Sequence, residues 1–214
     1  MQITWYGLSC FKITNGETTI LMSPFGKNTG LNPPKGKADI VLISENGESS
    51  YDGSDFVISG EGEYEAKGIL VNGFSFFRSE GSKMKKTTVY TLHIDGISVC
   101  HLDTISKEHV DALLEKIGEV DVLIIPVGGA HHKGKEEIKT LNAEEAVAVV
   151  AEIEPRIVIP MYYKVPKLSV GLQGPESFLK AMGCAGIDPV EKLSVKRKDL
   201  PQEETKVIVL SCGN

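Results

Sequence analysis

The sequence predicts an α/β fold in which β-sheets are covered by helices. Short runs rich in β-branched and aromatic residues fill the first hundred positions, and such runs are typical of strands. The second half alternates strand-like apolar runs with helical stripes, an order in which the sheet faces need helical cover. The chain has 214 residues, a length that fits a single domain over residues 1–214 better than a pair of domains.

Strands are expected at several places in the first half. Residues 3–13 and 18–22 flank Asn15-Gly16, a pair that favours a tight hairpin turn. The continuous apolar run at 39–44 is typical of a strand that is buried on both faces. Further strands are expected at residues 56–59, 69–77, 87–93 and 97–101, with Asp95-Gly96 as the turn between the last two.

Apolar side chains at helical spacing predict the helices of the second half. One helix covers residues 110–117, with Ser106 as its cap and Gly118 as its end. A second helix begins at Asn142 and Glu145, which have the spacing of a capping box. This second helix is expected to end at residue 153, and a third helix is expected over 174–183. Strands are expected over 122–127, 157–161, 190–195 and 207–210.

Composition and charge disfavour some partners. The net charge of −6 creates no field that attracts a polyanion, so nucleic acid is not favoured. No apolar run approaches the roughly 20 residues that cross a bilayer, and the N-terminus lacks the pattern of a secretion signal. The cysteines are scattered singly, as expected of free thiols in a reducing cytoplasm: Cys10, Cys100, Cys184 and Cys212.

Three local strings carry a family resemblance. They are Ile-Ser-Gly-Glu-Gly-Glu-Tyr-Glu at 58–65, His-Leu-Asp-Thr at 101–104 followed by the apolar run at 120–129, and Ile-Val-Ile-Pro-Met-Tyr-Tyr at 157–163. In this order they resemble the branch of the metallo-β-lactamase superfamily that includes the ascorbate-6-phosphate lactonase type and many bacterial zinc-dependent hydrolases. The resemblance spans about residues 3–163. It implies an α/β (α+β) fold, the αββα four-layer sandwich, with zinc or manganese held on loops between the sheet edges.

The metal-ligand strings of that family are altered in this chain. The family has His-x-His-x-Asp-His directly after a buried strand, and at those positions this chain has Glu45, Gly47, Ser49 and Ser50. Glycine offers no side-chain donor, and neutral serine is a poor ligand for first-row metals. Tyr162 stands where the family has the histidine of its Pro-Met-His string.

The other ligand positions point the same way, with one exception. The segment 73–78, where the family has a further histidine, contains none. Leu8 stands where a Gly-His pair is common, and Ser23 replaces the aspartate of the usual Asp-Pro-Phe. Asp103 fits the bridging aspartate of the family. A lone carboxylate does not hold a catalytic metal tightly, so we expect no bound zinc or manganese in this chain.

Histidines near these positions leave alternatives open. His131 and His132 could join Asp103, Glu45 or Glu61 in a replacement metal site, or they could be solvated beside neighbouring lysines, which we favour. His101 and Asp103 share a face of an extended chain, so they could form a pair, or His101 could simply be packed, which we also favour. Cys100 is expected in the core.

The favoured hypothesis is a non-catalytic member of the fold. Its remnant cleft, lined by Glu45, Asp103 and Tyr162, would bind a small molecule or a protein. The alternative is a hydrolase of metal-independent or weakly metal-dependent chemistry, with Asp103 as the general base, assisted by His101 or by a carboxylate of Glu45, Glu61 or Glu63. A homo-oligomer is a third hypothesis, favoured if Phe74, Phe76 or Phe77 is exposed.

Overall fold

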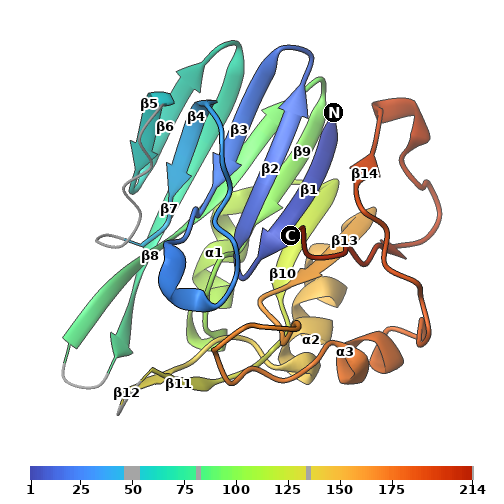
Figure 1. Cartoon of the computed structure of the whole chain (residues 1–214). Coiled ribbons are helices and arrows are strands. Elements are labelled where there is room, and N and C mark those ends of the chain that lie inside the picture. Colours follow the sequence, from blue (N-terminus) through green and yellow to red (C-terminus); the bar gives the residue numbers. More distant parts are fainter. Residues whose placement is uncertain (46–53, 81–82, 134–135, 214) are drawn as a thin grey trace.

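The chain folds into two stacked β-sheets with helices at the side of one of them (Figure 1). The structure is a computed structural model, which describes residues 1–45, 54–80, 83–133 and 136–213. Within these ranges, a six-stranded sheet stacks on a seven-stranded sheet, and both are mixed. The predicted α/β sandwich is therefore confirmed.

The six-stranded sheet is formed by the N-terminal part of the chain and one late strand. Its spatial order is β14 (Leu193–Ser194), β1 (Gln2–Gly7), β2 (Cys10–Asn15), β3 (Thr18–Met22), β4 (Ala38–Ile43) and β5 (Ser54–Ser59). Strands β3, β4 and β5 run parallel, so their carboxyl ends lie at the same edge.

The seven-stranded sheet is built from hairpins followed by helical crossovers. Its order is β15 (Lys206–Val207), β13 (Ile157–Met161), β10 (Val122–Pro126), β9 (Ile97–His101), β8 (Lys83–Ile94), β7 (Ile69–Glu80) and β6 (Gly62–Ala66). Helix α1 (Val110–Ile117) links β9 to β10, and α2 (Ala143–Ile153) links β10 to β13. Helix α3 (Glu176–Ala181) packs on α2.

One hydrophobic core joins the two sheets. Trp5 of β1 is fully buried, and its ring centroid lies 4.8 Å from that of Tyr163 and 6.2 Å from that of Phe11. Trp5, Tyr90 and Val122, from different sheets, belong to the same buried cluster. Fully burying one large apolar side chain is worth about 1.5–3 kcal/mol, so the facing sheets stabilise each other.

Several predicted strands differ from the structure. The segment 3–13 is two antiparallel strands, β1 and β2, because the chain reverses at Leu8 and Ser9. Gly7, with φ of +104°, permits that reversal. Strand β6 was not expected, β7 and β8 extend beyond the predicted ends, and the late strands at 190–195 and 207–210 are reduced to β14, β15 and a bridge between Val190 and Leu210.

Two other expectations are corrected. The stretch 128–141 contains a small hairpin, β11 (His131–Lys133) with β12 (Glu136–Ile138), where no strand was predicted. Ser106 does not cap α1; its hydroxyl donates to Glu108 Oε1, and it precedes the 3-10 turn Lys107–His109. Residues 46–53 lie outside the described residues, and Ser54 and Asp55 begin β5 ahead of the strand that was expected at 56–59.

The helix predictions are otherwise confirmed. Asn142 and Glu145 form a reciprocal capping box at the start of α2. Gly118 follows the last residue of α1. In the ranges that the structure describes, no helix is both long enough and apolar enough to cross a membrane.

Candidate functional site

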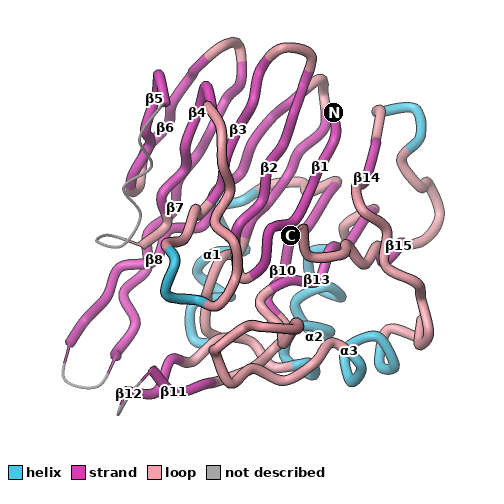
Figure 2. The backbone as a smooth tube through the Cα atoms, in the orientation of Figure 1, coloured by secondary structure: helices cyan, strands magenta, loops and turns pink. Residues whose placement is uncertain are grey.

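A cleft of about 570 Å³ opens where the carboxyl ends of strands from both sheets meet. Leu8 and Ser9 follow β1, Ser23 follows β3, and Tyr162 follows β13, and all of them line the cleft. Figure 2 shows the loops after these strands gathered at the end of the sandwich that carries β11 and β12. Its volume is in the range of pockets that hold small molecules.

The backbone of the cleft is held in an unusual conformation. Leu8, Ser23, Asp103 and Tyr162 all have positive φ, between 44° and 53°. Non-glycine residues adopt this left-handed region at a cost, and they remain there only where the surrounding structure fixes them. Such residues cluster at functional sites, so their gathering around one cleft marks it as the candidate site.

Hydrogen bonds fix the Leu8-Ser9 reversal. The indole Nε1 of Trp5 and the backbone N–H of Tyr162 both donate to the carbonyl of Leu8, at 2.9 and 3.3 Å. His101 Nε2 lies 2.9 Å from the carbonyl of Ser9 and donates to it, since a carbonyl can only accept. Burial lowers the pKa of His101, which keeps the ring neutral near pH 7, although the charge of Asp103 raises it.

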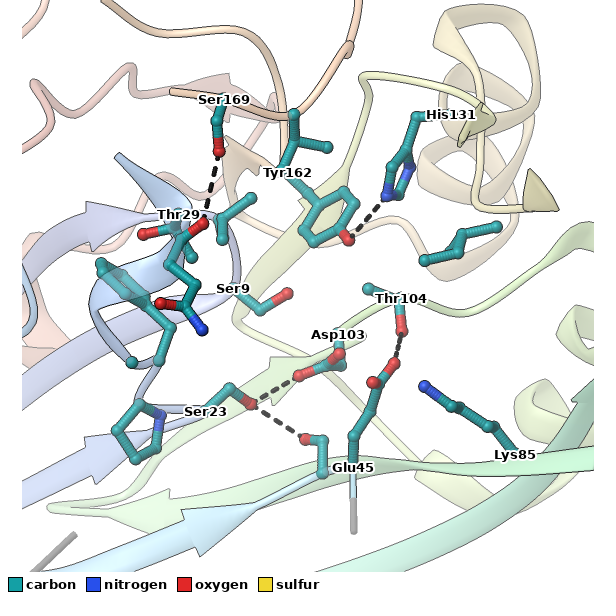
Figure 3. Close-up of a pocket in the computed structure, with 18 of the residues that line it drawn as sticks. Ser9, Ser23, Thr29, Glu45, Lys85, Asp103, Thr104, His131, Tyr162 and Ser169 are labelled. Carbon is teal, nitrogen blue, oxygen red and sulfur yellow. Dashed lines mark hydrogen bonds between the residues drawn. The ribbon is translucent and has the colours of Figure 1, made fainter. Parts of the chain in front are cut away.

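The floor of the cleft is a chain of hydroxyl groups that ends on Asp103 (Figure 3). The Ser23 hydroxyl donates to Asp103 Oδ2 over 2.5 Å, and Ser44 Oγ lies 3.1 Å from Ser23 Oγ. Ser23 has only one hydroxyl hydrogen, so Ser44 is the donor in the second contact.

Tyr90 of β8 anchors the strand end that carries Ser44. Its hydroxyl donates to the carbonyl of Ile43 over 2.8 Å and accepts the backbone N–H of Gly60 at 3.0 Å. Burial raises the pKa of Tyr90 to about 12, so the phenol keeps its proton and remains a donor at neutral pH. The bond to Ile43 ties the seven-stranded sheet to the six-stranded sheet directly beside the cleft.

Two further polar pairs line the cleft. Thr104 donates to Glu45 Oε1 over 3.0 Å. The Tyr162 hydroxyl lies 3.4 Å from His131 Nε2, and the two rings are 5.5 Å apart. Lys85, from the long strand β8, also lines the cleft, and Figure 3 places it on the side of Glu45.

The side chains present do not match the two-metal centre implied by the family resemblance. Among the described residues, no three His, Cys, Asp or Glu side chains lie close enough together to hold a metal ion. Oδ2 of Asp103 is engaged by a serine, and the phenol of Tyr162 stands where an imidazole would be needed. The sequence adds Gly47, Ser49 and Ser50, which lie outside the described residues.

The structure brings some of the predicted residues together and separates others. Glu45, Asp103 and Tyr162 line the same cleft, as do His131 and His132. The two histidines point apart: His131 is buried and His132 is exposed. His101 is fully buried against Phe11 and Ser9 and does not line the cleft, and Cys100 is also in the core. The carboxylates Glu61 and Glu63 are exposed elsewhere.

The sequence did not single out several residues of the cleft. Ser9 lies in the reversal that was expected to be continuous strand, and Lys85 lies on an extension of β8 beyond its predicted start. Val170 belongs to the segment after β13, whose path over the cleft no periodicity indicates. A usable signal existed for Ser9, because Gly7 interrupts an otherwise regular β pattern.

Of the aromatic residues that bear on an oligomer, Phe76 is buried and Phe77 is 58% exposed. Phe76 stacks on His109, with ring centroids 5.3 Å apart. One exposed phenylalanine is ordinary on a protein surface, so the homo-oligomer stays a prediction.

Known proteins share the sequence pattern of this chain. The model of the β-lactamase superfamily domain matches residues 2–162. A UPF0173 metal-dependent hydrolase of Thermococcus onnurineus is 30% identical over 96 residues, which are 44% of this chain and 38% of that protein. A UPF0173 protein of Pyrococcus furiosus is 27% identical over 189 residues, covering 76% of this chain and 83% of its own length. The chain thus matches less than two thirds of the first of these relatives.

Solved structures share the whole fold. A Thermotoga maritima protein named as a Zn-dependent hydrolase of the metallo-β-lactamase superfamily has a TM-score of 0.76 and 31% identity, over 98% of this chain and 97% of that one. A metallo hydrolase of Ignicoccus hospitalis has a TM-score of 0.59 at 18% identity, over 91% of this chain and 99% of its own, which is a likeness of fold alone.

Proposed function

The chain belongs to the metallo-β-lactamase superfamily, and from this premise we propose that it binds a small molecule in its cleft without the metal ions of the family. The observation that carries the proposal is the pairing of polar groups at the strand ends. Ser23 bonds to Asp103, and Thr104 bonds to Glu45. These contacts occupy oxygen atoms at the positions where the family needs open metal ligands.

The chemistry of the donors supports the absence of a metal centre. Two-metal hydrolysis needs several imidazole and carboxylate ligands that converge on ions about 3.5–4 Å apart. Hydroxyls of serine, threonine and tyrosine are neutral donors and acceptors, which suit hydrogen bonding to an organic ligand better than binding of a transition metal. The fold can keep its scaffold while such a site changes, because function depends on the residues grafted on it.

The cleft keeps the properties of a binding site. It combines a polar floor with apolar walls contributed by Leu8, Pro24, Phe25, Ile138 and Val170. Pockets of this kind bury the apolar part of a small ligand and orient it through a few polar groups. The left-handed residues around the cleft are a strain that a purely structural loop cluster would not need.

Two measurements test the proposal together. After dialysis, elemental analysis for zinc, manganese and iron is expected to find well below one equivalent of metal per chain. Thermal-shift screening of a library of small metabolites is expected to find compounds that raise the melting temperature, since a ligand that binds only the folded state stabilises it. Two or more retained equivalents of metal would contradict the proposal.

A matched pair of variants locates the binding. Val170→Trp places an indole in the cleft, whereas Val190→Trp places the same side chain at a position that is 45% exposed and outside the lining of the cleft. The compounds found with the native chain should lose their thermal shift with Val170→Trp and keep it with Val190→Trp. Equal shifts for both variants would place the ligand elsewhere.

A second candidate function is metal-independent hydrolysis. It is supported by the 2.5 Å bond from Ser23 to Asp103, which is the contact of a hydroxyl with a carboxylate base. Asp103 would accept the proton of Ser23 or of a bound water, with Glu45 in the same cleft. His101 cannot take part directly, because its Nε2 is bonded to Ser9 inside the core. Turnover of ester substrates that disappears with Asp103→Asn would favour this candidate.

A further inference from the structure

We propose that the cleft recognises the ammonium group of a small amine with an apolar tail, and that Asp103 receives this group. The proposal rests on the proposed function and names the class of ligand for the same cleft. It follows from the charge of the floor, from one buried hydroxyl and from the mixed polar and apolar lining of the cleft.

The Asp103 carboxylate is buried without a cationic partner among the side chains that the structure describes. Only 3% of this residue is exposed, and within the described part of the chain its carboxylate accepts a hydrogen bond only from the neutral hydroxyl of Ser23. The imidazole of His101 is engaged elsewhere, because its Nε2 donates to the carbonyl of Ser9 in the core. A buried carboxylate is costly unless it is paired, so the cleft offers a strong place for a cation.

Ser9 adds an independent sign of a missing partner. Ser9 is 5% exposed, and its Oγ has no hydrogen-bond partner among the described residues. Figure 3 shows this hydroxyl directed into the cleft, between Tyr162 and Asp103. A buried hydroxyl without a partner costs about 1–3 kcal/mol, and a ligand in the cleft can remove that cost.

A donor group satisfies both residues at once. The ionised carboxylate of Asp103 can only accept, and the Ser9 oxygen can accept as well. An ammonium group has several N–H donors, and its positive charge supplies the cationic partner that the Asp103 carboxylate needs. A carboxylate or phosphate ligand would instead meet the like charge of Asp103, at the end of the cleft where Ser23 and Ser44 also lie.

The rest of the cleft suits an apolar tail. Pro24, Phe25, Ile138 and Val170 add apolar lining to the cleft, together with the ring of Tyr162. The volume of about 570 Å³ accommodates a ligand with a ring or a short alkyl chain.

Three probes with one carbon skeleton test the ligand class. Benzylammonium, benzyl alcohol and benzoate share an aromatic ring and differ mainly in the charge of the attached group. Titration followed by NMR or calorimetry is expected to show benzylammonium binding at least about tenfold tighter than benzyl alcohol, as expected of a charged hydrogen bond, and benzoate weakest. Equal or tighter binding of the alcohol or of benzoate would overturn the inference while leaving binding in the cleft intact.

Variants of the floor test the position of the ammonium group. Asp103→Asn should reduce benzylammonium binding about tenfold and change benzyl alcohol binding little. Ser9→Ala should reduce benzylammonium binding by a smaller factor. Asp111→Asn, which removes an exposed carboxylate on α1, is the matched control and should leave all three affinities unchanged.

The outcomes separate this inference from the proposed function. Unchanged benzylammonium binding in a folded Asp103→Asn variant, checked by circular dichroism, would overturn it. So would a failure of all three probes to bind, even when the library screen with Val170→Trp identifies another cleft ligand. In that second case the cleft still binds small molecules, but its floor does not select an ammonium group.

Discussion

At Asp103, stability of the fold and binding of the ligand make opposite demands on one side chain. Among the described residues, only the Ser23 hydroxyl donates a hydrogen bond to its buried carboxylate, so the carboxylate destabilises the empty cleft. Asn keeps the shape, can still accept from Ser23, and tolerates the left-handed conformation of this position. We expect Asp103→Asn to raise the free energy of unfolding by about 1 kcal/mol and the melting temperature by about 2–4 °C.

Thermal and urea unfolding at pH 7 measure this effect. The control is again Asp111→Asn on the exposed face of α1, which should stay within about 0.5 kcal/mol of the native chain. A clear loss of stability in Asp103→Asn would mean that the carboxylate has a cationic partner and contributes to the fold. The ammonium proposal would then lose its main support.

Part of the site could be read from single residues of the sequence. Asp103, Glu45 and Tyr162 follow buried strands, and side chains at the carboxyl ends of neighbouring strands meet at one edge. The hydroxyl of Ser9 could not be assigned in this way, because its role depends on the reversal after Gly7. Nor could the sequence decide whether His101 faces Asp103 or the core, since both lie within reach of the same strand end.

The start of α2 shows how far sequence predicts an element. Asn142 Oδ1 accepts the backbone N–H of Glu145, and the Glu145 carboxylate accepts the backbone N–H of Asn142, both at 3.0 Å. Because the cap satisfies N–H groups that the helix itself leaves free, Asn142→Ala should lower the free energy of unfolding by about 1 kcal/mol. Asn142→Asp retains an acceptor and should lower it much less. Urea denaturation compares the two variants, and equal losses would contradict the capping role.

Periodicity could not predict where strands reverse or how far they extend. The run 3–13 has one β pattern throughout, yet the chain folds back on itself at Leu8 and Ser9. A side chain at Gly7 would collide with the side chain of Leu31. Leu31 reaches this place from a distant segment, and local sequence patterns contain no information on such a contact.

Asp39, at the start of β4, ties three elements together through its charge. It accepts the backbone N–H of Thr19 on β3 at 2.7 Å and lies 3.5 Å from Lys67 Nζ in the turn between β6 and β7. The bond from Thr19 is the main cause that holds the pKa of Asp39 below its usual value, and Lys67 adds to it. The stability that this carboxylate contributes is therefore present above pH of about 4 and is lost as the pH falls through its folded pKa.

The lowered pKa of Asp39 leads to a pH-dependent prediction. Asp39→Asn should be less stable than the native chain at pH 7, by less than about 1 kcal/mol, because both contacts are weakened. The difference in stability between the two chains should shrink as the pH falls below about 4, because protonation then makes the native side chain neutral, as Asn is. Urea unfolding at pH 7 and at pH 3 measures it. Glu63→Gln on the exposed face of β6 is the control, and a difference that persists at pH 3 would contradict the assignment.

At the scale of the whole molecule, the two sheets depend on a shared core and share the cleft. Leu8, Ser23 and Glu45 reach the cleft from the six-stranded sheet, and Asp103 and Tyr162 reach it from the seven-stranded sheet. The geometry of the floor, including the bond from Ser23 to Asp103, thus exists only while the sheets remain stacked. Ligand binding and sheet packing are coupled, since anything that binds only the native cleft stabilises the stack.

The shared core predicts that residues 1–214 unfold as one cooperative unit. The only tryptophan, Trp5, is fully buried in the six-stranded sheet and contacts Tyr163, which follows β13 of the other sheet. Its fluorescence reports the interface between the sheets, whereas far-UV circular dichroism reports the strands and helices throughout. Thermal unfolding followed by the two signals should have the same midpoint, with a heat-capacity change of roughly 3 kcal/mol/K for a chain of this length. A fluorescence transition clearly below the circular dichroism transition would show that the sheets separate first and that the chain contains two folding units.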